Sequence, residues 1–265
     1  MERADRVATL IGTHLRPLGR TRALTGAIVA GLVAAALLSG AAAPPSGHRT
    51  PPPPRPVIVP HELVVVAHGM GRSSLSMRPL VKALEAAGYE VMSFGYSSYC
   101  CTIPEIGAQL QRELAARVGP QHTRVHFVGH SLGNIVVRWV LSRDTLPPRV
   151  GRVVMLAPPN QGAHAANTFT PVVGWLLKPV GELRADSLAT VRRLPMVRGI
   201  EIGVIAARDD RTVKLPETHL TEEKEHVVVD GGHSFIMRRA DVHRLTIDFL
   251  RTGTFAGLRK AMVAP

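Results

Sequence analysis

The sequence contains only two cysteines, Cys100 and Cys101, and they are adjacent. Adjacent cysteines cannot link distant parts of the chain, which excludes a small domain held by a disulfide framework. Two free thiols, a vicinal disulfide and a link to another chain remain open, with two small apolar side chains near a loop as the simplest interpretation. No Cys/His set has the spacing of zinc ligands, so we expect no metal site.

Acidic residues are scarce: 20 Asp and Glu stand against 32 Lys and Arg, a formal charge of +12. A surplus of five lies in residues 1–60, where seven Arg stand against Glu2 and Asp5. Anionic lipid or nucleic acid could account for such a surplus, and so could an arginine-rich genome. No run of Lys and Arg is interleaved with aromatic residues, so we expect no nucleic-acid partner.

Residues 23–43 carry no charge at all, and 21 residues are enough for a helix to span a bilayer. The basic segment before them, residues 1–22, favours an inside N-terminus and an exported remainder. Ala41-Ala42-Ala43 also fits a signal-peptide cleavage site, but Pro44 makes cleavage there less favourable. We therefore expect a membrane anchor with an extracytoplasmic domain. The alternatives are a secreted protein with a cleaved signal peptide and a buried soluble helix.

Residues 44–60 are rich in proline, which predicts an extended linker. The globular domain is therefore expected over residues 61–265. Its strand-like runs are Leu63–Ala67, Tyr89–Phe94, Val125–Val128, Val153–Ala157, Ile202–Ala206 and Val227–Val229. Helical periodicity lies between or after them, at Leu75–Ala87, Ile103–Val118, Leu132–Ser142 and Val242–Leu250. Apolar strands alternating with amphipathic helices predict an α/β fold with a parallel sheet covered on both faces. Ligands in such sheets bind at the carboxyl ends of the strands.

The sequence Gly129-His130-Ser131-Leu132-Gly133 lies between a predicted strand and a predicted helix. Small residues on both sides let a serine take a strained conformation at the apex of a sharp turn. Such a turn lifts the hydroxyl clear of the sheet and places it at a helix N-terminus. In this strand–turn–helix context the motif predicts a nucleophile elbow with Ser131 as the nucleophile.

Another strand end carries His68-Gly69-Met70-Gly71. Glycines on both sides of Met70 let the backbone approach a bound acyl group closely, so that the Met70 N–H can point at a developing oxyanion. An ordinary glycine turn leading into a helix is the alternative.

A serine hydroxyl needs a base, and the base needs an acid to orient it. Of the twelve histidines, His233 follows a strand through Asp230-Gly231-Gly232 and precedes the last helix. We therefore expect His233 to be the base. The preceding strand runs into Asp209-Asp210; Asp210 is preferred, because Val213 would tuck into the core and fix the turn, and Asp209 remains the alternative.

Together these motifs and Ala157-Pro158-Pro159-Asn160-Gln161-Gly162 resemble the α/β-hydrolase superfamily, in its lipase/esterase group, over about residues 61–255. The resemblance implies Ser131 as nucleophile, His233 as base and Asp210 as its orienting acid, with the N–H groups of Met70 and Leu132 as the oxyanion hole. It places His68 and Gly69 in the substrate site and implies no cofactor. The strands that usually precede the His-Gly strand are replaced by the proline-rich linker. We therefore expect a minimal, mostly parallel sheet of about six strands, preceded by the N-terminal hydrophobic helix.

Residues 160–195 do not continue the alternation of predicted strands and helices. We expect them to form a small lid with a helix over Glu182–Arg193. Phe169, Trp175 and Leu176 would then line an acyl pocket. Their packing against the sheet is an equally good interpretation. An apolar lid on a membrane-tethered domain suits a lipid-like ester.

The sequence therefore predicts a serine hydrolase that cleaves carboxylic esters of apolar acyl groups through an acyl-enzyme. An acyltransferase of the same fold would deliver the acyl group to an acceptor other than water. A non-catalytic envelope scaffold is the third alternative, and the intact Ser/His/Asp set speaks against it.

Overall fold

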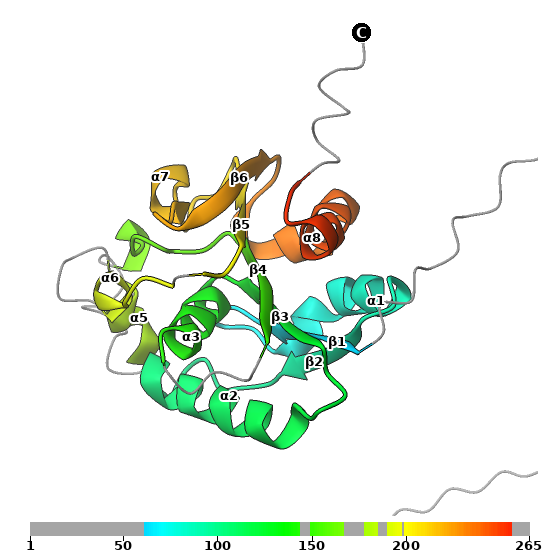
Figure 1. Cartoon of the computed structure of the whole chain (residues 1–265). Coiled ribbons are helices and arrows are strands. Elements are labelled where there is room, and N and C mark those ends of the chain that lie inside the picture. Colours follow the sequence, from blue (N-terminus) through cyan, green and yellow to red (C-terminus); the bar gives the residue numbers. More distant parts are fainter. Residues whose placement is uncertain (1–60, 144–148, 167–177, 185–189, 198, 256–265) are drawn as a thin grey trace, which may run out of the picture. The chain divides into compact units, whose positions relative to one another are not determined.

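The computed structural model describes residues 61–143, 149–166, 178–184, 190–197 and 199–255. Six strands form one sheet in the order β2-β1-β3-β4-β5-β6, and every neighbouring pair is parallel (Figure 1). The predicted sheet of about six strands is thereby confirmed. The strands are β1 (Glu62–Ala67), β2 (Glu90–Phe94), β3 (Arg124–His130), β4 (Val150–Leu156), β5 (Ile202–Ala207) and β6 (Glu223–Val229).

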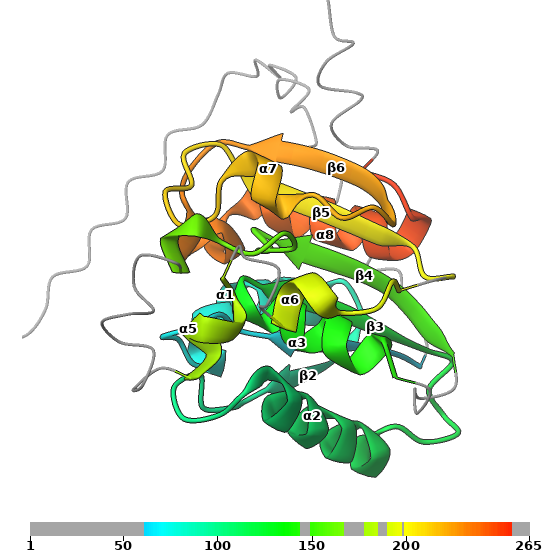
Figure 2. The same ribbon diagram turned by 90° about the vertical axis from the view of Figure 1, so that its left-hand side faces the viewer.

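Four longer helices cover the sheet, two on each face. In Figure 1, α2 (Ile103–Arg117) and α3 (Leu132–Leu141) lie below and to the left of the sheet, and α1 (Arg78–Ala86) and α8 (Ala240–Thr252) lie to its right. In Figure 2, α2 and α3 lie in front of the sheet, and α1 and α8 lie behind it. Successive side chains of a strand point to opposite faces, so each strand contributes to both cores. On β1, Leu63 and Val65 pack with α2 and α3, whereas Val64 and Val66 pack with α1 and α8.

The helix boundaries follow from local sequence. Pro79 lies in the first turn of α1, where it removes no helical hydrogen bond, and a 3₁₀ turn over Ser74–Met77 precedes the helix. Thr102 and Glu105 form a capping box at the start of α2. Gly253 ends α8 with φ 76°, a left-handed conformation that glycine adopts without strain.

The segment predicted as a lid contains two short helices, α5 (Lys178–Glu182) and α6 (Thr190–Arg193). The predicted continuous helix over Glu182–Arg193 is wrong, because the chain leaves α5 after Glu182. The Ala163 N–H donates to the Leu183 carbonyl oxygen at 2.8 Å, and Ala163 and Arg184 form a parallel bridge. This extended pairing competes with helix formation. Phe169, Trp175 and Leu176 lie outside the described residues.

The predicted N-terminal basic segment, membrane segment and linker also lie outside the described residues. Within the part of the chain that is described, no helix is long and apolar enough to cross a bilayer.

A disulfide joins Cys100 to its neighbour Cys101 in the loop between β2 and α2. Of the alternatives open from the sequence, the structure therefore has the vicinal disulfide. Tyr99, the residue before it, lines the cavity described below.

Candidate active site

The turn between β3 and α3 holds Ser131 in a backbone conformation that is unusual for a residue other than glycine. Its φ is 52° and its ψ is −122°. The Ser131 N–H donates to the Leu156 carbonyl oxygen of β4 at 3.0 Å, and the Asn134 N–H donates to the Ser131 carbonyl oxygen at 3.0 Å. These bonds from both sides hold the strained residue, as expected for a nucleophile elbow.

Three glycines allow the backbones around the elbow to approach one another. A Cβ on Gly129 would lie 2.4 Å from Asn134 Oδ1, and one on Gly69 would lie 2.7 Å from His130 Nδ1. A Cβ on Gly133 would lie 2.5 Å from the Ala67 carbonyl oxygen and 2.6 Å from that of His68. Any side chain at 133 would therefore push α3 away from the end of β1.

Gly133→Ala is expected to lower the free energy of unfolding by about 1–3 kcal/mol, because the added methyl group meets backbone atoms that cannot move aside. Gly95→Ala is the matched control, since a Cβ there has no neighbour within 4 Å. Its effect should stay within about 0.5 kcal/mol. Urea unfolding curves measure both, and equal midpoints for the two variants would contradict the packing argument.

Three side chains from different strand ends form a continuous hydrogen-bonded line. Ser131 follows β3, Asp210 follows β5 and His233 follows β6. His233 Nε2 lies 2.9 Å from Ser131 Oγ, and His233 Nδ1 lies 2.6 Å from Asp210 Oδ2. With the Nδ1 proton donated to the carboxylate, Nε2 is free to accept the serine proton.

The carboxylate that contacts His233 belongs to Asp210. Asp210 Oδ1 accepts the N–H groups of Thr212 and Val213, both at 2.8 Å, and Val213 is buried. These two bonds orient the second oxygen toward the imidazole. Asp209 is exposed, and among the described residues its side chain accepts only a long bond of 3.4 Å from the Gly231 N–H.

The N–H groups of Met70 and Leu132 donate to no other group within the described part of the chain. Leu132 is the first residue of α3, where backbone N–H groups lack helical partners. The loop that carries Met70 is fixed by its neighbour Gly71, whose N–H donates to Ser98 Oγ at 2.9 Å. Nothing in the sequence around Ser98 indicates this role.

The structure places His68 and Gly69 behind the cavity wall, where they do not line the cavity. The expected direct contact of these two residues with substrate is therefore not supported. The His68 ring is fully buried and stacks on Tyr96 at 4.1 Å, while its Nδ1 bonds the Gly69 carbonyl oxygen at 2.8 Å. His68 thus holds the loop from behind, and Met70 reaches the cavity.

Ser131 and His233 open into a cavity of about 510 Å³. Much of its wall is apolar, from Met70, Pro159, Ala163, Ala165, Ala166, Leu183 and Val213. Ala163, Ala165, Ala166 and Leu183 come from the segment expected to be a lid, so part of that segment does lie beside Ser131. The sequence pattern did not single out these small residues, because only large apolar side chains were considered as pocket candidates.

His130 links the elbow to the loop that carries His233. Its Nε2 donates to the His233 carbonyl oxygen at 2.9 Å, and the two rings lie 5.0 Å apart. Burial lowers the pKa of His130, with a smaller contribution from the neighbouring His233, to about 3. The ring therefore stays neutral, so it does not oppose a positive charge on His233.

Stability should fall as the pH drops from 6.5 toward 3. The folded protein keeps His130 neutral, whereas the unfolded chain binds a proton below its ordinary pKa of 6.5, so acid favours the unfolded state. His130 alone contributes about 1.4 kcal/mol per pH unit in this window. Burial also lowers the pKa values of His68 and His226, which add in the same direction.

Urea unfolding at pH 7, 6 and 5 would test this expectation with His130→Asn. The variant should lose less stability than the wild type between pH 7 and 5. Equal slopes would contradict the buried neutral state of His130. Carboxylates with lowered pKa values, such as Glu62 and Glu201, lose their contribution only below 4.5, outside this range.

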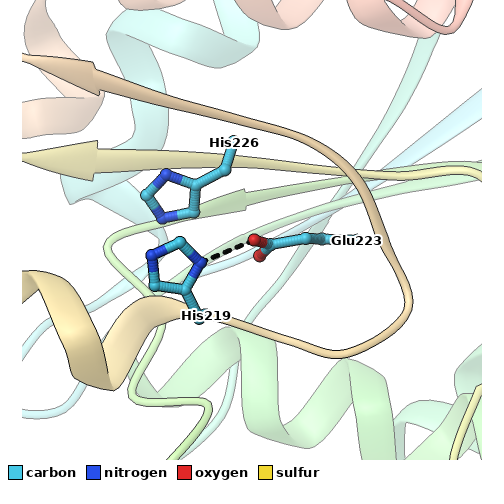
Figure 3. A group of neighbouring side chains, drawn as sticks. All are labelled: His219, Glu223 and His226. Atoms are coloured by element: carbon cyan, nitrogen blue, oxygen red, sulfur yellow. Dashed lines mark hydrogen bonds and ion pairs between the residues drawn. The ribbon is translucent and has the colours of Figure 1, made fainter.

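A second group of polar side chains lies away from the cavity, at His219, Glu223 and His226 (Figure 3). Their donor atoms lie within 4.8 Å of one another, a grouping missed because only cysteine and histidine spacings were considered. His219 Nδ1 donates to Glu223 at 2.7 Å, and the two imidazole rings stack at 4.1 Å. Stacked rings cannot both direct in-plane lone pairs at one ion without turning, so we assign no metal to this group.

Comparisons with known proteins agree with this architecture. No protein-family model matches the chain, and no curated protein sequence matches it significantly. Among solved structures, a Bacillus licheniformis lipase, BlEst2, aligns with TM-score 0.56 and 16% identity over 77% of this chain and 95% of the lipase. The Pyrococcus furiosus esterase Pf2001 aligns with TM-score 0.54 and 19% identity, over 72% and 83% of the two chains.

An extracellular α/β-hydrolase from a Paenibacillus species aligns with TM-score 0.51 and 15% identity, over 72% of this chain and 98% of that chain. At these identities the likeness concerns architecture alone. The parallel sheet, the layers on its two faces and these likenesses together show that the chain has the α/β-hydrolase fold.

Proposed function

We propose that the protein hydrolyses carboxylic esters with an apolar acyl group, using Ser131, His233 and Asp210 as a catalytic triad. The observation that carries the proposal is the line of hydrogen bonds from Asp210 through His233 to Ser131, which ends in a cavity with an apolar wall. Two of the structural neighbours, a lipase and an esterase, are in keeping with this chemistry.

In the proposed reaction, Ser131 Oγ attacks the ester carbonyl carbon while its proton passes to His233 Nε2. The carbonyl oxygen becomes an oxyanion and accepts the N–H groups of Met70 and Leu132. His233 then gives its proton to the leaving alcohol as the C–O bond breaks. A water molecule, deprotonated by His233, attacks the acyl-enzyme and releases the acid with Ser131 restored. Asp210 remains ionised and stabilises the imidazolium in both halves of the cycle.

Labelling with a fluorophosphonate, followed by peptide mapping, tests the nucleophile. We expect one label per chain, on Ser131, and hydrolysis of p-nitrophenyl esters by the unlabelled protein. A label on another serine, or no turnover across esters from acetate to decanoate, would refute the proposal. Product analysis with and without an added alcohol separates hydrolysis from acyl transfer, which shares the same acyl-enzyme.

We further propose that the hydrolase domain works outside the cytoplasmic membrane. The support is the uncharged run over residues 23–43 after an arginine-rich segment, followed by a proline-rich linker. Fractionation of cells separates an anchored form from a secreted one. A protein found only in the cytosol would contradict this location.

A further inference from the structure

Two arginines beside the cavity carry charges that no acidic side chain balances within the described residues. Arg72 follows Gly71 in the loop after β1, and Arg238 ends the 3₁₀ helix that begins at His233. Neither makes an ion pair or a side-chain hydrogen bond in that part of the chain. Two other arginines, by contrast, form ion pairs: Arg208 with Asp230 at 2.9 Å and Arg239 with Asp241 at 2.6 Å.

Both guanidinium groups are held against the same aromatic ring. Arg72 Cζ lies 5.5 Å from the centroid of the Phe235 ring, and Arg238 Cζ lies 5.0 Å from it. Phe235 is 56% exposed, so it is a large apolar side chain kept at the surface. Cation–π contact positions a guanidinium without neutralising it. The ring therefore gathers two cations whose hydrogen-bond donors stay available to a ligand.

These arginines line a second cavity of about 490 Å³ that is open to solvent, together with Ser73, Leu75, Ser76 and Tyr99. This cavity shares Gly71, Arg72 and Tyr99 with the cavity of Ser131, so the two adjoin. The charge of Arg72 is felt in the first cavity, where it contributes to the lowered pKa of His130. A group in the second cavity would therefore lie next to the cavity that holds the ester.

The alcohol portion of a substrate has a route into the second cavity at Gly71, Arg72 and Tyr99, which line both cavities. Arg238 lines only the second cavity, whereas Arg72 lines both. The apolar wall of Ala163, Ala166 and Leu183 belongs only to the first cavity, where it suits the acyl chain. With the acyl chain against this wall, an alcohol that extends past Arg72 would enter the second cavity and meet Arg238.

We propose that this second cavity binds an anionic group, a phosphate or a carboxylate, on the alcohol portion of the substrate. The proposal rests on the ester-hydrolase function and narrows its substrate class. Guanidinium groups offer paired N–H donors that match the oxygens of both anions. Substrates would be esters of an apolar acid with an acidic alcohol.

The test uses three soluble butanoyl esters, those of glycerol, glyceric acid and glycerol 3-phosphate, which differ only in the group at one end of the alcohol. At low ionic strength we expect kcat/KM for at least one anionic ester to exceed that for the glycerol ester by about 10-fold, which corresponds to 1.4 kcal/mol. The anionic ester with the larger ratio of kcat/KM to that of the glycerol ester shows whether the cavity prefers phosphate or carboxylate. Added salt should reduce the ratio.

The double variant Arg72→Gln/Arg238→Gln should bring this ratio close to one. Its matched control is Arg112→Gln/Arg244→Gln, which removes the same charge from exposed positions on α2 and α8 and should keep the preference. The ratio is the readout, so a general loss of activity in a variant does not affect it.

The proposal would be overturned if the wild type hydrolysed both anionic esters with the same kcat/KM as the glycerol ester. A preference for an anionic ester that persists in Arg72→Gln/Arg238→Gln would also overturn it. In either case Ser131-dependent hydrolysis of the glycerol ester would leave the ester-hydrolase function standing. If none of the three esters is hydrolysed and fluorophosphonate does not label the protein, the ester-hydrolase function itself is contradicted.

Discussion

Ser131→Ala is expected to lower kcat/KM for a carboxylic ester by about 10⁴- to 10⁶-fold, because the acyl-enzyme can no longer form. The fold should survive, since alanine loses only the Oγ atom and its single hydrogen bond to His233 Nε2 at 2.9 Å. Steady-state kinetics with a p-nitrophenyl ester and fluorophosphonate labelling measure the effect.

Ser234→Ala is the matched control, because this serine lines the same cavity but follows His233 in the chain. The Ser234 variant should keep both turnover and labelling. Loss of activity in the Ser234 variant, with full activity in the Ser131 variant, would show that Ser234 and not Ser131 is the nucleophile.

Asp210→Asn is expected to lower kcat by about 10⁴-fold. An asparagine can keep the acceptor oxygen that bonds the N–H groups of Thr212 and Val213, at 2.8 Å each, so the loop should hold its shape. The other end of the side chain would then present an amide donor to His233 Nδ1. The imidazole would have to carry its proton on Nε2, where it could no longer accept the proton of Ser131.

Asp209→Asn changes the same chemical group one residue earlier and should alter kcat less than about 3-fold, within the range of an exposed side chain. Equal losses in the two variants would mean that the negative charge of the loop matters, rather than the contact with the imidazole. Thermal unfolding of both variants separates an effect on catalysis from one on stability.

The sheet was predictable from the sequence because each strand contains a short apolar run, and the runs of the inner strands β1, β3, β4 and β5 are largely buried. The edge strands β2 and β6 are more exposed and include charged residues. The elbow was also predictable, since glycines on both sides of Ser131 are needed for a close approach that the structure shows at Gly133 and Ala67. The choice of Asp210 depended on a local argument about Val213, which is buried as expected and bonds the carboxylate through its N–H.

Contacts between distant segments were not predictable in this way. Ser98 fixes the loop of Met70 from 27 residues away, and Arg138 in α3 bonds the Asn160 carbonyl oxygen. The helix expected over Glu182–Arg193 failed for the same reason, because pairing of Ala163 with Arg184 outweighs local helical preference. The support given by His68 from behind the cavity wall likewise depends on the stacked ring of Tyr96.

The hydrogen bond between Ser131 and His233 joins residues 102 positions apart, and β4 and β5 lie between their strands in sequence. Parallel pairing of this kind closes long loops, which makes folding slow. A chain still emerging from the ribosome would contain the serine but not its base. During refolding, fluorophosphonate reactivity should accordingly return in the last phase, after the helical circular dichroism signal has recovered. Its return would report when the sheet is complete.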